Sequence, residues 1–94
     1  MKVNIDKYPI VKITWVDATD GDSGWVSFDD IINHKLSTVV DIGWLVVKTK
    51  EKIILMSSFG DHADSPEGGR YTPIPSGWVK KVEYLSVESV RVVE

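Results

Sequence analysis

Short runs of β-branched and aromatic residues, separated by turn-forming residues about every ten positions, constrain this fold more than any other feature. The clearest run, Pro9 to Asp17, alternates with the period of a half-buried strand. Val11, Ile13 and Trp15 share one face, and we expect that face to join the core. The alternation therefore predicts a mainly β protein.

The same kind of pattern predicts further strands. Ser37 to Lys48 is rich in β-branched residues, and Gly43 in its middle predicts a bulge or sharp bend. Thr49 to Lys52 is short and polar, which predicts a hairpin turn into an antiparallel strand over Ile53 to Phe59. Gly60 to Thr72 is polar and glycine-rich, and we expect a long loop there.

The chain after this loop returns to strand. Its prolines limit Pro73 to Pro75 to a brief edge strand, because each lacks a ladder donor. Ser76 to Trp78 is then expected to form a single turn. Val79 to Glu94 is expected to be a strand, with a bulge near Leu85.

One short helix interrupts the strands. Ser27 and Asp30 match a capping box, which predicts a helix from Phe28 to about His34. Its apolar residues recur at i, i+3 and i+4, enough for one or two turns to lie against a sheet.

This element count predicts a small five-stranded barrel of the SH3-like or Sm-like kind, with one short helix after the first strand. Closure would remove the edges of so short a sheet. An α+β open sheet is the alternative. We expect a single domain over residues 1–94, with a core at about 8–85 and a C-terminal strand extension at 86–94. That extension could pair with another subunit, which favours a homo-oligomer.

Composition narrows the function. The 94 residues carry a net charge of −3, which argues against a protein that coats duplex nucleic acid. The chain has no cysteine, so thiolate catalysis and disulfides are excluded. No apolar run reaches the length of a membrane span, and no signal peptide is recognised, so we expect the cytoplasm and no membrane contact. No nucleophile or cofactor motif occurs, and we expect a non-catalytic protein without a cofactor.

The acidic loop between Trp15 and Trp25 is the first candidate site. It carries Asp17, Asp22 and Ser23 beside an aromatic ring, a combination suited to a ligand. The carboxylate spacing does not fit a calcium loop, and self-bonded turns explain the aspartates as well, so we expect no metal. Trp25 is the ring expected to meet a ligand.

A second candidate is Glu67 to Tyr71. Its two glycines could form an anion-binding nest, Arg70 adds a donor matched to phosphate, and Tyr71 could stack nearby. A flexible turn with an exposed arginine is the rival interpretation. Trp78 sits at a turn boundary and is a further surface candidate, whereas Trp15 and Trp44 are assigned to the core.

Five short motifs recur in order along the chain: Trp15-x-Asp17-Ala18, Ser23-Gly24-Trp25, Gly43-Trp44-Leu45-Val46, Ile54-Leu55-Met56-Ser57-Ser58 and Ile74-Pro75-Ser76-Gly77. Taken together, these motifs resemble those of a family of small uncharacterised proteins of tailed bacteriophages. The resemblance covers about Tyr8 to Leu85. This chain differs in having Ser76 where the family usually has lysine, and in continuing beyond Leu85.

The resemblance implies a phage accessory protein, and such proteins are often counter-defence factors. The leading hypothesis is a sponge that sequesters a cyclic nucleotide immune signal in the host cytoplasm. Its ligand-binding residues would be Trp25, Asp17, Asp22, Ser23, Arg70, Tyr71 and Trp78. The alternative is an adaptor or inhibitor that binds a host or virion protein through an aromatic surface. Binding of single-stranded nucleic acid is disfavoured by the acidic balance.

Overall fold

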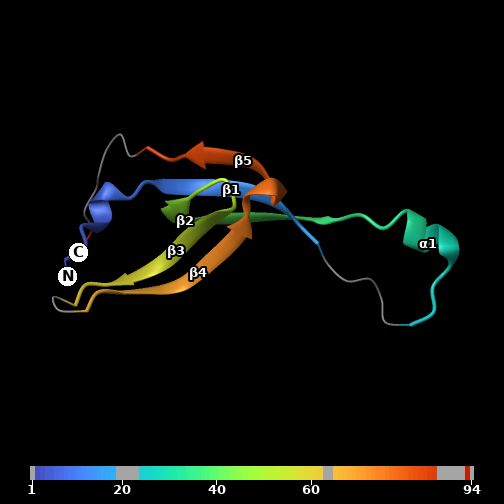
Figure 1. Ribbon diagram of the computed structural model, residues 1–94, viewed down its shortest axis with the longest axis horizontal. Coiled ribbons are helices and arrows are strands. Elements are labelled where there is room, and N and C mark those ends of the chain that lie inside the picture. Colours follow the sequence, from blue (N-terminus) through green and yellow to red (C-terminus); the bar gives the residue numbers. More distant parts are fainter. Residues whose placement is uncertain (1, 19–23, 63–64, 87–92, 94) are drawn as a thin grey trace.

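The computed structural model describes residues 2–18, 24–62, 65–86 and 93. Its centre is an antiparallel sheet of five strands in the order β4-β3-β2-β1-β5 (Figure 1). The strands are β1 (Ile10–Asp17), β2 (Ser37–Lys48), β3 (Lys52–Gly60), β4 (Glu67–Pro75) and β5 (Val79–Tyr84). Two short 3₁₀ helices, η1 (Ile5–Lys7) and η2 (Ser76–Trp78), and one α-helix, α1 (Phe28–Ile32), complete the described elements.

The alternation predicted for β1 is confirmed. Val11 and Ile13 are fully buried, and Trp15 packs partly buried against the same core. β1 lies inside the sheet because it pairs with β2 on one side and with β5 on the other. The core of described residues is small and consists of Val11, Ile13, Leu45, Ile53, Leu55 and Ile74.

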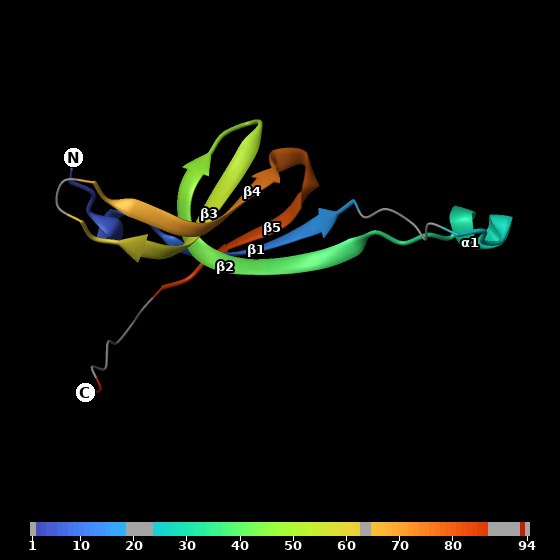
Figure 2. The same ribbon diagram turned by 90° about the horizontal axis from the view of Figure 1, so that it is seen from below.

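β2 is the longest strand, and it bends between its two partners. Its first part pairs with β1 as far as Trp44, and its last part pairs with β3 (Figure 2). The register shifts between Leu45 and Val47, so the predicted irregularity lies just beyond Gly43. Gly43 is buried, and a Cβ there would lie 2.7 Å from the Met56 carbonyl oxygen. Glycine at this position therefore permits a close approach of β3.

The predicted hairpin between β2 and β3 is confirmed. Thr49 N–H donates to the Lys52 carbonyl at 2.9 Å, and the Thr49 hydroxyl accepts from the Glu51 and Lys52 amides. Ser76 ties the start of η2 to this turn, since its hydroxyl donates to the Thr49 carbonyl at 2.8 Å and its amide to the Glu51 carbonyl at 2.9 Å. Ser76 therefore links η2 to the hairpin between β2 and β3.

The long loop predicted over Gly60 to Thr72 is wrong, because β4 begins at Glu67 and pairs along β3. Gly68 and Gly69 lie opposite Phe59 and Ser58 in the ladder, so they do not form the predicted anion-binding turn. A Cβ on Gly68 would clash with the sulfur atom of Met56. Gly68 therefore leaves room for the Met56 side chain across the strands, and the glycine pair that suggested a loop lies within β4.

The ends of two predicted elements also differ. The helix stops at Ile32 rather than His34, because Asn33 closes it by donating from both its amide and its side chain to the Asp29 carbonyl. β5 ends at Tyr84, and the rest of the predicted C-terminal strand falls mostly at 87–92 and 94, outside the described residues.

The sheet of the described strands is open, since β4 and β5 lie at its two edges and do not pair. The mainly β class with one short helix is confirmed, and a closed barrel is not. None of the described helices is long and apolar enough to cross a membrane.

Candidate binding surfaces

The segment between β1 and β2 projects away from the sheet and carries α1 at its far end (Figures 1 and 2). We call the described part of this segment, residues 24–36, the arm. The expectation that α1 lies against the sheet is wrong, because no residue of α1 is buried. The Ser27 hydroxyl caps the helix by accepting from the Asp30 amide at 3.2 Å. The local sequence therefore folds the helix as predicted, without a sheet to cover it.

The end of the arm exposes a cluster of large apolar side chains. Trp25 is fully exposed, and Phe28 of α1 is 75% exposed. Apolar clusters of this kind on a soluble protein usually mark an interaction surface. Two carboxylates, Asp29 and Asp30, lie in the first turn of the same helix. We call the cluster the arm tip and define it as Trp25, Val26, Phe28, Ile31 and Ile32.

A groove lies at the opposite end of the arm, where it meets the sheet. The groove has a volume of about 340 Å³, and the aromatic part of its wall is Trp78 of η2. Lys80 of β5 adds a positive charge to an otherwise apolar lining. We call it the Trp78 groove, and its lining consists of Val16, Ala18, Leu36, Gly77, Trp78, Val79 and Lys80.

Trp78 is held in place by a second tryptophan. Its ring stacks on Trp15 with centroids 6.4 Å apart and an angle of 18° between the planes. The Trp15 indole N–H donates to the Asp41 carboxylate at 2.8 Å, which fixes the Trp15 ring to β2. Trp78 itself stays 41% exposed. The pair therefore presents a fixed aromatic surface to the groove.

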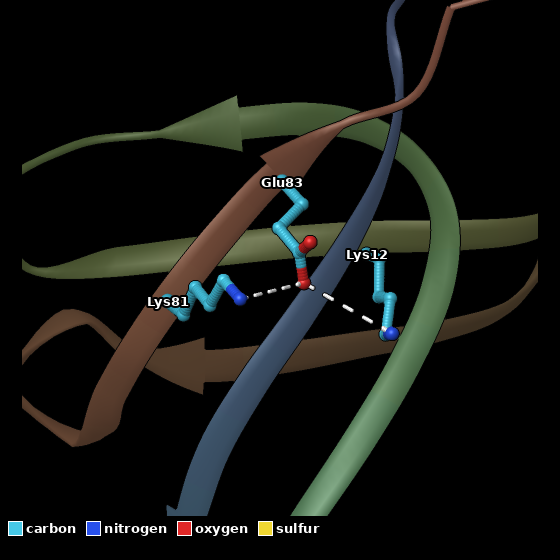
Figure 3. Close-up of polar contacts among 3 residues, drawn as sticks. All are labelled: Lys12, Lys81 and Glu83. Atoms are coloured by element: carbon cyan, nitrogen blue, oxygen red, sulfur yellow. Dashed lines mark ion pairs between the residues drawn. The ribbon is translucent and has the colours of Figure 1, made fainter.

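Two of the charged residues of β5, Lys81 and Glu83, take part in ion pairs (Figure 3). Glu83 lies 3.5 Å from Lys81 of the same strand and 4.0 Å from Lys12 of β1. These are the ion pairs formed by the part of the chain that the structure describes, and Lys80 is in neither. Lys80 is therefore the cation of β5 that is available to a ligand in the groove.

The structure does not bring the predicted site residues together in one chain. Trp25 lies at the arm tip and Trp78 in the groove, while Asp17 pairs with Ser37 where the arm begins. Asp22 and Ser23 lie outside the described residues.

The other two predicted residues, Arg70 and Tyr71, are on the edge strand β4. Both are exposed, and Arg70 has φ 52°, in the left-handed region. No aromatic contact or hydrogen bond among the described residues joins either of them to Trp78. Their roles in ligand binding stay predictions.

Sequence reasoning missed one further hollow, at the other end of the sheet. It has a volume of about 620 Å³ and lies between the N-terminal segment Lys2–Asp6 and the residues Phe59, Asp61 and His62. Nothing in the sequence placed Asp61 and His62 beside the N-terminal segment. Within residues 2–18, 24–62, 65–86 and 93, no group of three or more acidic or histidine side chains is placed to hold a metal ion.

Comparison of the chain with protein-family models, with curated proteins and with solved structures finds no match. The arm tip and the Trp78 groove are therefore the surfaces that indicate a function.

Proposed function

We propose that this protein is a non-catalytic binding protein that docks on a partner protein through its arm tip. The observation that carries this proposal is the exposure of Trp25, Phe28, Ile31 and Ile32 at the end of an arm held away from the sheet. Full burial of a large apolar side chain contributes about 2 kcal/mol, and the three helical residues are 75%, 56% and 65% exposed, so covering them offers roughly 4 kcal/mol. Binding of a partner would remove the apolar side chains of the arm tip from water.

The chemistry of the arm tip also describes the partner. Phe28, Ile31 and Ile32 follow the i, i+3, i+4 spacing by which a helix fills an apolar groove. Asp29 and Asp30, in the first turn of the same helix, add negative charge beside these apolar residues. The complementary surface is therefore an apolar groove with a basic side chain at its rim.

A photo-cross-linking amino acid in place of Phe28 tests this proposal in cells that produce the full chain. We expect adducts of defined mass from position 28, and fewer of them when Trp25→Ala is added. Ile42 is the matched control position, because it is 57% exposed but lies on the sheet. Equal adducts from positions 28 and 42, or none from position 28, would refute docking through the arm tip.

We propose a second candidate function, sequestration of a cyclic nucleotide signal, on the geometry of the Trp78 groove. Its volume of about 340 Å³ falls in the range of small-molecule sites, roughly 300–1,000 Å³. The exposed part of Trp78 offers a stacking surface for a base, and Lys80 offers a donor for phosphate. The resemblance to phage accessory proteins supports the same candidate.

Mass spectrometry of small molecules released from the purified protein tests the second candidate. A nucleotide retained by the native chain should be lost from Lys80→Glu and kept by Ile42→Ser, which alters the sheet surface instead. Calorimetric titration with cyclic di- and trinucleotides gives the affinity. If none binds and none is released, the sponge function is refuted.

We also propose that the strands form an incomplete barrel of the SH3-like type. The support is the order β4-β3-β2-β1-β5, in which the bent β2 serves both halves of the sheet and η2 links the two edges. Amide hydrogen exchange tests it. An incomplete barrel predicts slow exchange of the β5 amides that pair with β1 and fast exchange of those on the outer edge of β5, whereas slow exchange along both edges would refute the open edge.

A further inference from the structure

We propose that the partner that covers the arm tip is a second copy of this chain, with each tip seated in the Trp78 groove of the other copy. This inference rests on the proposed docking function and names its partner. The arm tip requires a partner with an apolar groove and a basic side chain at the rim of that groove. The Trp78 groove, with Leu36, Val79 and Lys80 in its lining, meets that requirement.

The placement of the two surfaces makes the pairing reciprocal. The arm tip and the Trp78 groove lie at opposite ends of one arm (Figure 2). When two arms lie side by side in opposite directions, the tip of each reaches the base of the other. A two-fold axis between the arms then forms both contacts at once, which is the closed symmetry most common among protein dimers.

Charge favours the same arrangement. The first turn of α1 carries Asp29 and Asp30, and the groove carries Lys80, which is outside both ion pairs of the described residues. A reciprocal dimer brings this attraction into play twice. Each chain has a net charge of −3, so the two copies repel one another at long range and the local complementarity sets the register.

The chain exposes enough area for a second copy to cover. The chain exposes 7840 Å², whereas a compact monomer of this mass exposes about 5,400 Å². The Cα radius of gyration is 17.9 Å, against about 12 Å for a compact domain of this length. Pairing of the arms would cover part of this exposed surface.

The first test is the mass of the full chain in solution, by sedimentation equilibrium across a concentration series. We expect about twice the 10.5 kDa of one chain. Ile31→Glu at the tip and Leu36→Glu in the groove should each weaken dimerisation on the order of a thousand-fold, because a two-fold dimer loses two apolar contacts at once. Ile42→Glu is the matched control, since its exposure of 57% equals that of Leu36 and is close to the 56% of Ile31.

Mixing the two weakened variants provides the sharper test. Each variant alone has no intact tip–groove contact in its dimer, whereas a mixed dimer keeps one, formed by the native tip of the Leu36→Glu chain and the native groove of the Ile31→Glu chain. We therefore expect dimers in the mixture at concentrations where each variant alone is monomeric. Circular dichroism of each variant checks that the sheet is intact.

The outcomes separate this inference from the function on which it rests. A monomeric native chain overturns the inference, as does a dimer that Ile31→Glu leaves unchanged or a mixture without complementation. If the chain is monomeric and position 28 still cross-links to a different protein, docking through the arm tip survives and the second copy is excluded. If position 28 gives no adduct, both fail.

Discussion

Gly43 lies where β2 bends, and its replacement by alanine tests whether close approach to β3 holds the sheet together. An ideal Cβ at position 43 would lie 2.7 Å from the Met56 carbonyl oxygen and 3.3 Å from its carbonyl carbon. Ordinary carbon–oxygen contacts are about 3.3–3.6 Å. The β3 backbone must therefore move by roughly 0.6 Å, and unlike the end of a flexible side chain it is fixed by its own ladder bonds.

We expect Gly43→Ala to lower the free energy of unfolding by about 2 kcal/mol, the usual cost of forcing an extra methyl group into a packed site. Restriction of the unfolded chain by alanine offsets roughly 0.5 kcal/mol of the strain. Urea denaturation followed by tryptophan fluorescence measures the difference.

Gly77→Ala is the matched control, because a Cβ at position 77 meets nothing within 4 Å and no described glycine has a positive φ. We expect it to be neutral or slightly stabilising. Equal stability of the Gly43→Ala and Gly77→Ala variants would show that β3 yields freely at Met56 and would refute the argument.

Three further variants probe contacts of different strength. Ser27→Ala removes the cap of α1 and should destabilise that helix by about 1 kcal/mol, seen as lost helical NMR shifts, with the sheet's urea midpoint unchanged because α1 is exposed. Ser76→Ala removes the hydrogen bond to the Thr49 carbonyl and should lower the unfolding free energy by about 1 kcal/mol, and an unchanged midpoint would contradict the tie between η2 and the hairpin. Glu83→Ala breaks two surface ion pairs and should change stability by less than about 1 kcal/mol, so a larger loss in urea would show that these charges matter.

The strand alternation and turn chemistry predicted most of the sheet, because they are local properties of the chain. β4 was missed at Glu67–Thr72, since glycine pairs normally weaken a strand and the sequence does not reveal that Met56 occupies the space beside Gly68. The barrel was predicted from the number of strands and from the edges that closure would remove, and neither determines whether the edges meet.

The candidate site was less predictable than the fold. Exposure of Trp25 and Trp78 was expected from their positions beside turns, and it is confirmed. Their separation was not expected, because the spacing of Phe28, Ile31 and Ile32 is the same for a helix that covers its own sheet and for one that covers another molecule. The direction of the arm depends on β1 and β2 staying paired beyond the ends of β5 and β3, which local sequence patterns do not determine.

The position of β1 has a consequence for how the chain acquires its structure. Val11 pairs with Tyr84 and Ile13 with Val82, so the first of the five strands to be synthesised depends on the fifth. Contacts between such distant parts of a chain slow folding, because a long loop must close before they form. During synthesis one hydrogen-bonding edge of β1 therefore has no partner until β5 is made, and newly made chains are most vulnerable to aggregation just before β5 is complete.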